Sequence, residues 1–284
     1  MTVSLDGPSL SLLSAKGNSI LSWLTMPFNP RLLSAAGVQD PKGLSSVISS
    51  AVQRMGKAPR TVLVAYAGRL TSRLMALPPV KGVNPDILVP REARRLMGTA
   101  ADYQHLFWAP VEAASGTTQY LLLAAPRTDL NNFVQSLLLA GLRPKRVEAR
   151  PLALARAVGS PDAIIINLGQ DQMEVLVLAR HIPFVTAQRA LRLGLSAEDL
   201  VSEIVDEVQR ALAFYNERNP GATLPASTPL YLSGRHHLVR EGGHQLLQTA
   251  LQRPVQPPGP HIISYPADFP VSEYLVNVGL ALRS

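Results

Sequence analysis

Apolar residues recur at the three- and four-residue spacing of a helix face in several stretches of the chain. The spacing predicts long helices over residues 41–55, 127–140 and 196–216. Ser196 is a suitable N-cap residue for the last of these, and Thr128 or Asp129 is expected to cap the middle one. Shorter helices are predicted over residues 89–97, 151–158, 241–252 and 272–282.

Short apolar runs bounded by turn residues predict strands. Residues 3–5 and 10–13 flank an Asp6-Gly7-Pro8 turn. Residues 163–178 form a buried run, a tight turn at Gly169 and a second run, which predicts a hairpin. Further strands are predicted over residues 19–24, 61–66, 69–77, 105–111, 119–125, 182–189 and 229–233.

The order of these elements predicts an α/β protein in two halves. Residues 69–150 have the order strand, helix, strand, strand, helix, strand, which is typical of a small α+β subdomain. Residues 159–162, Gly-Ser-Pro-Asp, are the best candidate for a boundary between the halves.

Composition supports a folded protein and limits its chemistry. The chain has 284 residues, 46% of them hydrophobic and 17% charged, so it can bury a sizeable core. It has no cysteine, which excludes disulfides and thiolate metal sites. The first residues lack the pattern of a signal peptide, and the longest apolar runs fall far below the roughly 20 residues of a membrane span. We therefore expect a cytoplasmic protein.

The net charge of +7 leaves three alternatives open. A nucleic-acid-binding protein would cluster its cations and interleave aromatic residues, whereas only 5% of residues here are aromatic and the cations are scattered. A membrane surface or an acidic partner fits a diffuse positive charge better. The remaining alternative is an ordinary solvated basic surface, and we expect no nucleic-acid partner.

The hairpin at Gly169 is the main candidate for binding chemistry. Folds that hold a nucleotide between two halves place an acid before such a glycine and hydroxyl residues after it. Here Asn167 stands in place of the acid, and residues 170–172, Gln-Asp-Gln, stand in place of the hydroxyls. No serine-hydrolase elbow occurs, and the His236-His237 pair has no third ligand at metal spacing, so we predict no catalytic residue and no metal site.

Four segments, in chain order, resemble PilM, the actin-like protein of type IV pilus assembly that is related to the cell-division protein FtsA. They extend over much of the chain, and the last two are the most specific. The segments are residues 140–148, residues 200–204 with 210–215, residues 230–234 (Leu-Tyr-Leu-Ser-Gly) and residues 277–283 (Asn-Val-Gly-Leu-Ala-Leu-Arg).

The resemblance implies a two-lobed actin-like (ribonuclease H-like) α/β fold. It implies a first lobe over residues 1–158 with a subdomain inserted at about 69–150, and a second lobe over 159–284 whose closing subdomain is reduced or missing. The cleft between the lobes would hold ATP and magnesium in the family. The residues at the matching positions are Asp6, Ser9, Ser11, Asn167, Gly169 and Gly234.

Several departures from the family pattern predict a degenerate nucleotide site and no cofactor. Pro8 replaces a glycine of the first phosphate loop and removes a backbone donor. Leu13 replaces its lysine, Asn167 replaces an aspartate, and Arg235 replaces the second glycine of the adenosine turn. Each lost charged hydrogen bond is worth about 1.5–3 kcal/mol, so we expect ATP binding to be weak or absent.

The resemblance also implies a function as a non-catalytic scaffold of a pilus assembly machine. Its partner would be a PilN-like inner-membrane protein, whose N-terminal cytoplasmic peptide binds between the first lobe and the inserted subdomain of PilM. Other inner-membrane or motor ATPase components are further candidate partners, and the chain would lie peripherally at the inner membrane. The candidate groove residues are Leu74, Leu77, Val89, Leu96 and Leu121.

Three alternatives remain at this point. A GspL-like cytoplasmic module of type II secretion has a related fold without nucleotide. An active actin-like ATPase would tolerate the substitutions, and it would be stabilised by ATP with magnesium. A basic nucleic-acid-binding module would show steep salt dependence.

Overall fold

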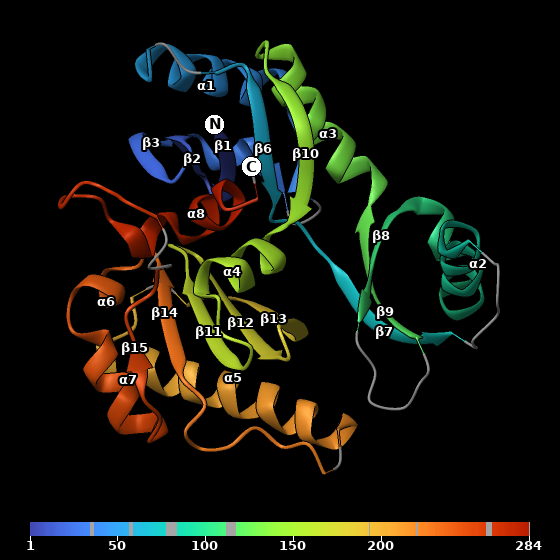
Figure 1. The fold of residues 1–284 in the computed structure, drawn as a ribbon. Helices are drawn as coiled ribbons and strands as arrows, with labels where there is room; N and C mark the ends of the chain where they lie inside the picture. Colours follow the sequence, from blue (N-terminus) through green and yellow to red (C-terminus); the bar gives the residue numbers. More distant parts are fainter. Residues whose placement is uncertain are drawn as a thin grey trace.

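The chain folds into two lobes and an inserted unit at the side of the first lobe (Figure 1). The computed structural model describes residues 1–34, 37–56, 59–77, 84–111, 118–192, 194–219, 221–259 and 263–283. In Figure 1 the first lobe lies at the top, the second at the bottom and the inserted unit at the right. The predicted two-lobed α/β architecture is confirmed.

The first lobe is built on a five-stranded sheet of order β10-β6-β1-β2-β3. The three strands β1, β2 and β3 form an antiparallel meander, and β6 and β10 add in parallel on the far side of β1. Helices α1 and α3 pack against each other and cover one face of the sheet. The bounds are β1 Thr2–Asp6, β2 Ser9–Lys16, β3 Ser19–Pro27, η1 Pro30–Leu32, β4 Leu33–Ser34, β5 Gly37–Val38, α1 Pro41–Arg54, β6 Thr61–Tyr66, α3 Arg127–Leu139 and β10 Arg143–Ala149.

The second lobe repeats this plan with the sheet order β13-β12-β11-β14-β15. The strand β11 is apolar along nearly its whole length because it is buried on both faces of the sheet. Helix α5 covers one face, and Ser196 caps it by accepting a hydrogen bond from the Asp199 amide at 3.1 Å, as the sequence predicted. The bounds are β11 Ala163–Leu168, β12 Gln172–Ala179, β13 Ile182–Ala190, α5 Ala197–Arg218, β14 Leu230–Gly234, α6 His237–Arg240, α7 Gly243–Leu251 and β15 Val255–Gln256.

The inserted unit is a three-stranded sheet of order β7-β9-β8 with helix α2 on its outer face. Its elements are β7 Thr71–Leu77, α2 Pro85–Met97, η2 Gly98–Tyr103, β8 Gln104–Val111 and β9 Thr118–Pro126. The predicted unit of residues 69–150 was therefore too long. Strand β10 pairs with β6 in the first-lobe sheet, and α3 packs on α1, so both belong to the first lobe.

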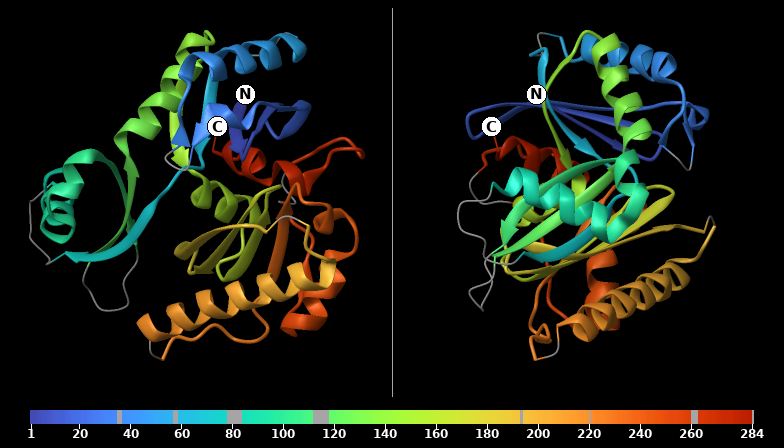
Figure 2. Two further views of the ribbon diagram at one scale, coloured as in Figure 1. Left: turned by 180° about the vertical axis from the view of Figure 1, so that it is seen from behind. Right: turned by 90° about the vertical axis from the view of Figure 1, so that its right-hand side faces the viewer.

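Two helices cross between the lobes and carry their main contact. Helix α4, Arg150–Val158, follows the first-lobe sheet, and α8, Leu275–Ala281, follows the short η3, Val271–Tyr274, of the second lobe. A Cβ on Gly279 would lie 1.9 Å from the carbonyl oxygen of Ala153, so only glycine permits this crossing. Both views in Figure 2 show the red α8 inserted beneath the first-lobe sheet, where it contacts β1, β2 and β6.

Two predicted helices differ from the observed ones. The helix predicted over 89–97 begins at Pro85, with Asn84 as its cap, so Pro90 lies inside it rather than at its start. The helix predicted over 241–252 is α7, which begins after Gly242, whose φ of +83° belongs to the left-handed region; the short α6 before it was not predicted. Among the described helices, none is long and apolar enough to cross a membrane.

Candidate functional site

Two glycine turns, one from each lobe, contact each other at the bottom of the interlobe cleft. The first joins β1 to β2 at Gly7, and the second joins β11 to β12 at Gly169. A Cβ on Gly7 would lie 2.5 Å from Asp171 Oδ1, and a Cβ on Gly169 would lie 2.6 Å from Asp6 Oδ1. Each turn thus packs its glycine against a carboxylate of the opposite turn.

The carboxylates of this contact lie in a cluster of buried charge. Arg150 at the start of α4 forms an ion pair with Glu174 of β12 at 2.7 Å, and their side chains are only 5% and 1% exposed. Burial raises the pKa of Asp6, while the positive charges of Arg150 and Arg235 act in the opposite direction. The cluster joins residues of both lobes, so it stabilises one relative placement of the two turns.

Arg235 connects the second lobe to the first. It follows Gly234, whose φ of +109° and close approach to Leu168 exclude any side chain. The Arg235 side chain is 8% exposed, donates from Nη2 to Ser11 Oγ at 3.0 Å and lies 3.4 Å from Glu273. Its guanidinium carbon is also 5.1 Å from the ring centroid of Tyr274. The position that is glycine in the family pattern therefore holds a buried interlobe bond.

The predicted cleft residues are brought together. Asp6 and Ser9 are cross-strand partners at the first turn, and Ser11 accepts the hydrogen bond from Arg235 beside Gly234. Asn167, only 6% exposed, accepts a hydrogen bond from Ser233 Oγ at 3.1 Å. The sequence identified these positions, but Ser11 and Asn167 are already hydrogen-bonded within the protein, to Arg235 and Ser233.

The residues present do not fit a magnesium-bound triphosphate. A phosphate chain between the two turns would have to separate the Gly7–Asp171 and Gly169–Asp6 contacts. Leu13, at the position of the family lysine, is fully buried in the apolar cluster between the lobes. It supplies no positive charge to a phosphate group.

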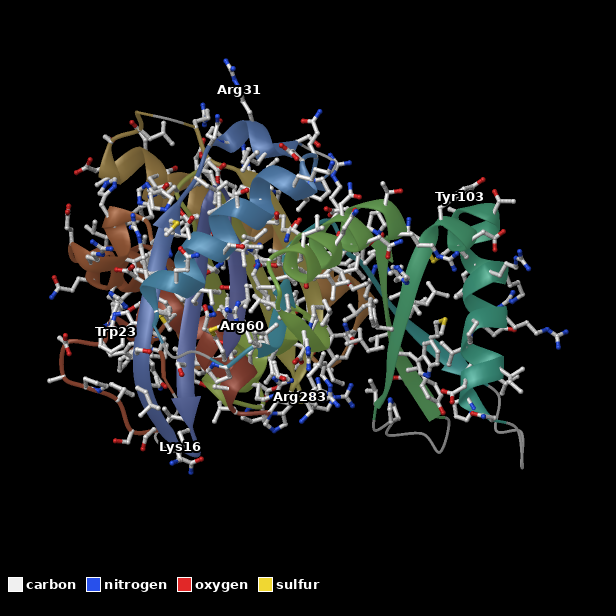
Figure 3. All side chains as sticks on the ribbon, turned by 90° about the horizontal axis from the view of Figure 1, so that it is seen from above. Lys16, Trp23, Arg31, Arg60, Tyr103 and Arg283 are labelled. Atoms are coloured by element: carbon white, nitrogen blue, oxygen red, sulfur yellow. The ribbon has the colours of Figure 1, made fainter. Side chains whose placement is uncertain are left out.

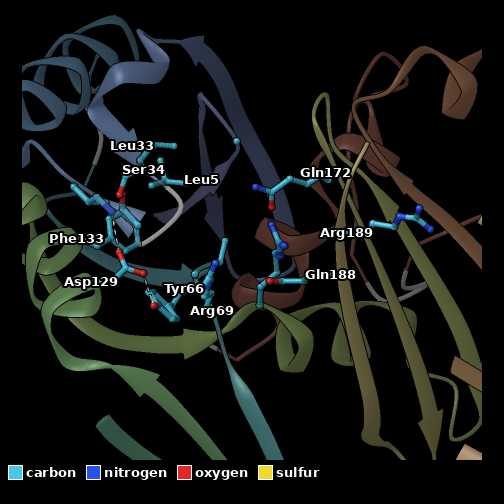
Figure 4. A pocket seen from close by; sticks show the side chains of 17 residues that line it. Leu5, Leu33, Ser34, Tyr66, Arg69, Asp129, Phe133, Gln172, Gln188 and Arg189 are labelled. Atoms are coloured by element: carbon cyan, nitrogen blue, oxygen red, sulfur yellow. Dashed lines mark hydrogen bonds between the residues drawn. The ribbon is translucent and has the colours of Figure 1, made fainter. Parts of the chain in front are cut away.

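A cavity of about 440 Å³ opens beside this cluster, between β6, α3 and the second-lobe strands (Figure 4). Asp129 in its wall accepts hydrogen bonds from Tyr66 Oη at 2.5 Å and from the Val38 amide at 2.9 Å. Burial and the bond to Asp129 raise the pKa of Tyr66. The expected cap of α3 is therefore wrong, because the Asp129 side chain ties β5 and β6 to the helix instead.

Two grooves flank the inserted sheet. The β8–β10 groove, about 800 Å³, lies between the inserted unit and the first lobe. Its wall is formed by β8, β9, β10 and α4, and its residues include Phe107, Trp108, Leu121, Leu123, Arg146, Leu152, Arg156, His181 and Arg283. The β7–β13 groove, about 730 Å³, lies between the inserted unit and the second lobe.

The predicted groove residues are only partly in place. Leu77 and Val89 are 4% and 0% exposed in the core beneath α2, so they line neither groove. Leu74 and Leu96 line the β7–β13 groove, and only Leu121 lines the β8–β10 groove as well. The residues of β8, β10 and α4 were missed because no common motif marks them.

Comparisons with known proteins identify the fold. No family model matches the chain, and no curated protein matches it. A solved structure of the PilM-PilN type IV pilus biogenesis complex matches with a TM-score of 0.81 and 20% identity, covering 99% of this chain and 97% of that one.

Two further structures are similar at a lower level. The cytoplasmic domain of EpsL, an inner-membrane component of the Vibrio cholerae type II secretion system, has a TM-score of 0.53, 16% identity and coverage of 100% and 94%. A Bacteroides thetaiotaomicron protein with an actin-like ATPase fold has a TM-score of 0.51, 10% identity and coverage of 99% and 94%. At these identities the likeness establishes the actin-like fold of this chain.

Proposed function

We propose that this chain is a PilM-like, non-catalytic cytoplasmic scaffold of a type IV pilus machine. It binds the N-terminal cytoplasmic peptide of a PilN-like inner-membrane protein in the β8–β10 groove. The observation that carries this proposal is a preformed apolar groove between two free strand edges, in a chain that matches a PilM-PilN structure along its whole length.

The edges of the groove suit an extended peptide. Among the described residues, β8 pairs only with β9 and β10 only with β6, so each has one edge without a described strand partner. Pro110 of β8 and Pro144 of β10 stand on these edge strands, where a missing N–H is tolerated. The remaining main-chain groups of an edge strand can pair with an added strand.

The lining gives the groove both apolar and positive character. Leu121, Leu123 and Leu152 supply apolar surface for the side chains of a bound peptide. Glu148 is already neutralised by Arg156 and by Arg283, the latter at 2.9 Å. Arg146 has no ion-pair partner among the described residues, so the groove favours a peptide with a carboxylate near its apolar residues.

The buried charges of the cleft support a scaffold that does not require nucleotide. The net charge of +7 also favours peripheral association with an anionic inner membrane. The likeness to the cytoplasmic domain of EpsL supports a closely related second candidate, a module of type II secretion. The two differ in which inner-membrane peptide binds.

The test is isothermal titration of the full chain with the cytoplasmic peptides of a PilN-like protein and of its type II secretion counterpart. Arg146→Glu and Leu152→Asp change the groove wall, and Arg143→Glu, exposed on the same strand β10 but outside the groove, is the matched control. We expect micromolar binding that the two groove variants weaken at least tenfold, or about 1.4 kcal/mol, and the control leaves unchanged. Binding that is equal in all three variants would refute the assigned groove.

The absence of a nucleotide function is tested separately. Titration with magnesium and ATP up to about 1 mM is expected to show no binding, since one charged hydrogen bond lost from a site costs about 1.5–3 kcal/mol. Binding with a dissociation constant in the low micromolar range would show that the cleft accepts nucleotide. The scaffold would then have to be treated as a nucleotide-dependent switch.

A further inference from the structure

The β7–β13 groove has a different chemical character from the β8–β10 groove. Its floor is the inner face of the inserted sheet, and its opposite wall is β13 with the C-terminal end of α5, which lies beneath that sheet in Figure 1. The described lining residues include three arginines, Arg73, Arg180 and Arg218, and none of the described lining residues is acidic.

The three arginines are exposed, and none of them takes part in an ion pair among the described residues. Arg218 lies 4.3 Å over the ring of Phe214, and Arg180 lies 5.9 Å from the ring centroid of Phe184. Ring faces orient a guanidinium without neutralising it. Asp162 Oδ1 accepts a hydrogen bond from the Arg180 main-chain amide at 2.9 Å.

Exposed apolar side chains stand between these cations. Leu74 is 36% exposed, and Leu96 and Phe214 are each 43% exposed. A partner that covers these side chains removes their apolar area from water. The surface therefore presents apolar area that a partner can cover while its carboxylates meet the arginines.

Two edge strands, β7 and β13, border the groove. In the part of the chain that the structure describes, β7 pairs only with β9, and β13 pairs only with β12. The two edges approach each other across the groove. An extended segment is the conformation that can use such an edge, through main-chain hydrogen bonds and alternating side chains.

The turn that presents Arg180 is held in a costly conformation. Arg180 and His181 have φ values of 52° and 64°, in the left-handed region that glycine or asparagine normally occupies. The His181 amide donates to the Pro161 carbonyl at 2.7 Å, which helps to fix the turn. As a result Arg180 lines the β7–β13 groove and His181 lines the β8–β10 groove.

We propose that the β7–β13 groove binds an extended acidic segment of a partner protein. Its carboxylates pair with Arg73, Arg180 and Arg218, and an apolar residue between them covers Leu74 and Phe214. This surface lies on the opposite edge of the inserted sheet from the β8–β10 groove. The inference therefore does not depend on the pilus peptide.

The experiment uses the full chain and a phage-displayed library of random peptides about ten residues long, the upper range of natural strands. Peptides are selected on the unaltered protein and depleted on the Arg73→Glu/Arg218→Glu double variant. Selected peptides are then measured by fluorescence polarisation against the unaltered protein, the double variant and Arg31→Glu. Arg31 is an exposed arginine on the first lobe, away from the inserted sheet (Figure 3), and is the matched control.

We expect the selection to enrich peptides with several carboxylates around an apolar residue. The double variant should bind them at least tenfold more weakly, and Arg31→Glu should bind them within twofold of the unaltered protein. No enrichment, enrichment of neutral or basic peptides, or equal loss in Arg31→Glu would overturn the proposal. It would also be overturned if phosphatidylglycerol vesicles, and no peptide, lost binding in the double variant, because the arginines would then serve a membrane surface.

Discussion

The interlobe bond of Arg235 leads to a quantitative prediction about the stability of the chain. Replacing Arg235 by alanine removes the hydrogen bond to Ser11 and the ion pair with Glu273. Both interactions are made by an arginine side chain that is only 8% exposed. A hydrogen bond involving a charged group is worth about 1.5–3 kcal/mol. Losing one partner of a buried pair costs about 3–5 kcal/mol when the other charge is left alone.

Two features of the site reduce these figures. Glu273 keeps a second partner, Arg240, so its charge is not left unpaired. The Nε atom of Arg235 is buried without a hydrogen-bond partner, and removing it recovers about 1–3 kcal/mol. We expect a net loss of about 2 kcal/mol, which at a slope of about 3 kcal/mol per molar urea lowers the unfolding midpoint by about 0.7 M.

The assay is urea unfolding followed by tryptophan fluorescence. The chain has two tryptophans, and Trp23 lies 5.0 Å from the ring of Phe269 in the cluster between the lobes. Replacing Trp108 of the inserted unit by phenylalanine leaves Trp23 as the reporter, and Arg31→Ala serves as the exposed control. A midpoint of Arg235→Ala equal to that of the control would refute the reasoning that this side chain joins the lobes.

Two further predictions concern the same interface and the charged cluster. Gly279→Ala places a Cβ against the Ala153 carbonyl and is expected to cost about 1–3 kcal/mol or more in the same assay, whereas unchanged stability would contradict the close crossing of α4 and α8. Burial raises the pKa of Asp6, so the folded state favours its protonated form. The protonated carboxyl contributes fully to the free energy of unfolding below the pKa of the unfolded state, about 3.9, and this contribution is lost as pH rises through the pKa of the folded state. Asp6→Asn should therefore be more stable than the parent at pH 8, and this difference should shrink toward about pH 4. A variant that is less stable than the parent at pH 8 would show that the charges of Arg150 and Arg235 outweigh burial at Asp6.

The periodic elements could be predicted because one face of each is buried against a sheet. Residues 41–55 and 196–216 place apolar and polar positions with the helical period, and α1 and α5 lie there, the latter with the predicted cap Ser196. Turn positions such as Gly7 and Gly234 could also be predicted from the local sequence, for a different reason. Glycine is required there by positive φ or by close approach of the chain.

Strand partners and strand faces could not be predicted from the same signals. The residues of strand β10 show no pattern that indicates whether it pairs within the inserted unit or with β6. The end of the inserted unit was therefore misplaced at residue 150. Leu74 and Leu77 are three positions apart on β7 and point to opposite faces, one toward a groove and one toward α2. A list of apolar residues contains both, and only the register separates them.

The cleft shows a third case, in which sequence identified the position but not its role. Arg235 stood out as a departure from a glycine pattern, one of those that predict a degenerate nucleotide site. Its hydrogen bond to Ser11 spans 224 residues of sequence and depends on how the two lobes meet. A local motif carries no information about such a partner.

In the proposed scaffold, the angle between the lobes is set by the chain itself. Asn277 of α8 accepts from Ser4 Oγ at 2.8 Å and donates to Thr2 Oγ1 at 3.1 Å, so buried hydrogen bonds join the second lobe to β1. The hydrogen bond from Arg235 to Ser11 and the close packing of Gly279 on Ala153 also fix one lobe relative to the other. Since the inserted unit is continuous with β6 and α3 of the first lobe, fixing the lobes also fixes the distance from β7 to β13. A nucleotide that opened and closed the cleft would change that distance. The internal contacts keep the β7–β13 groove open to a partner without the need for a bound nucleotide.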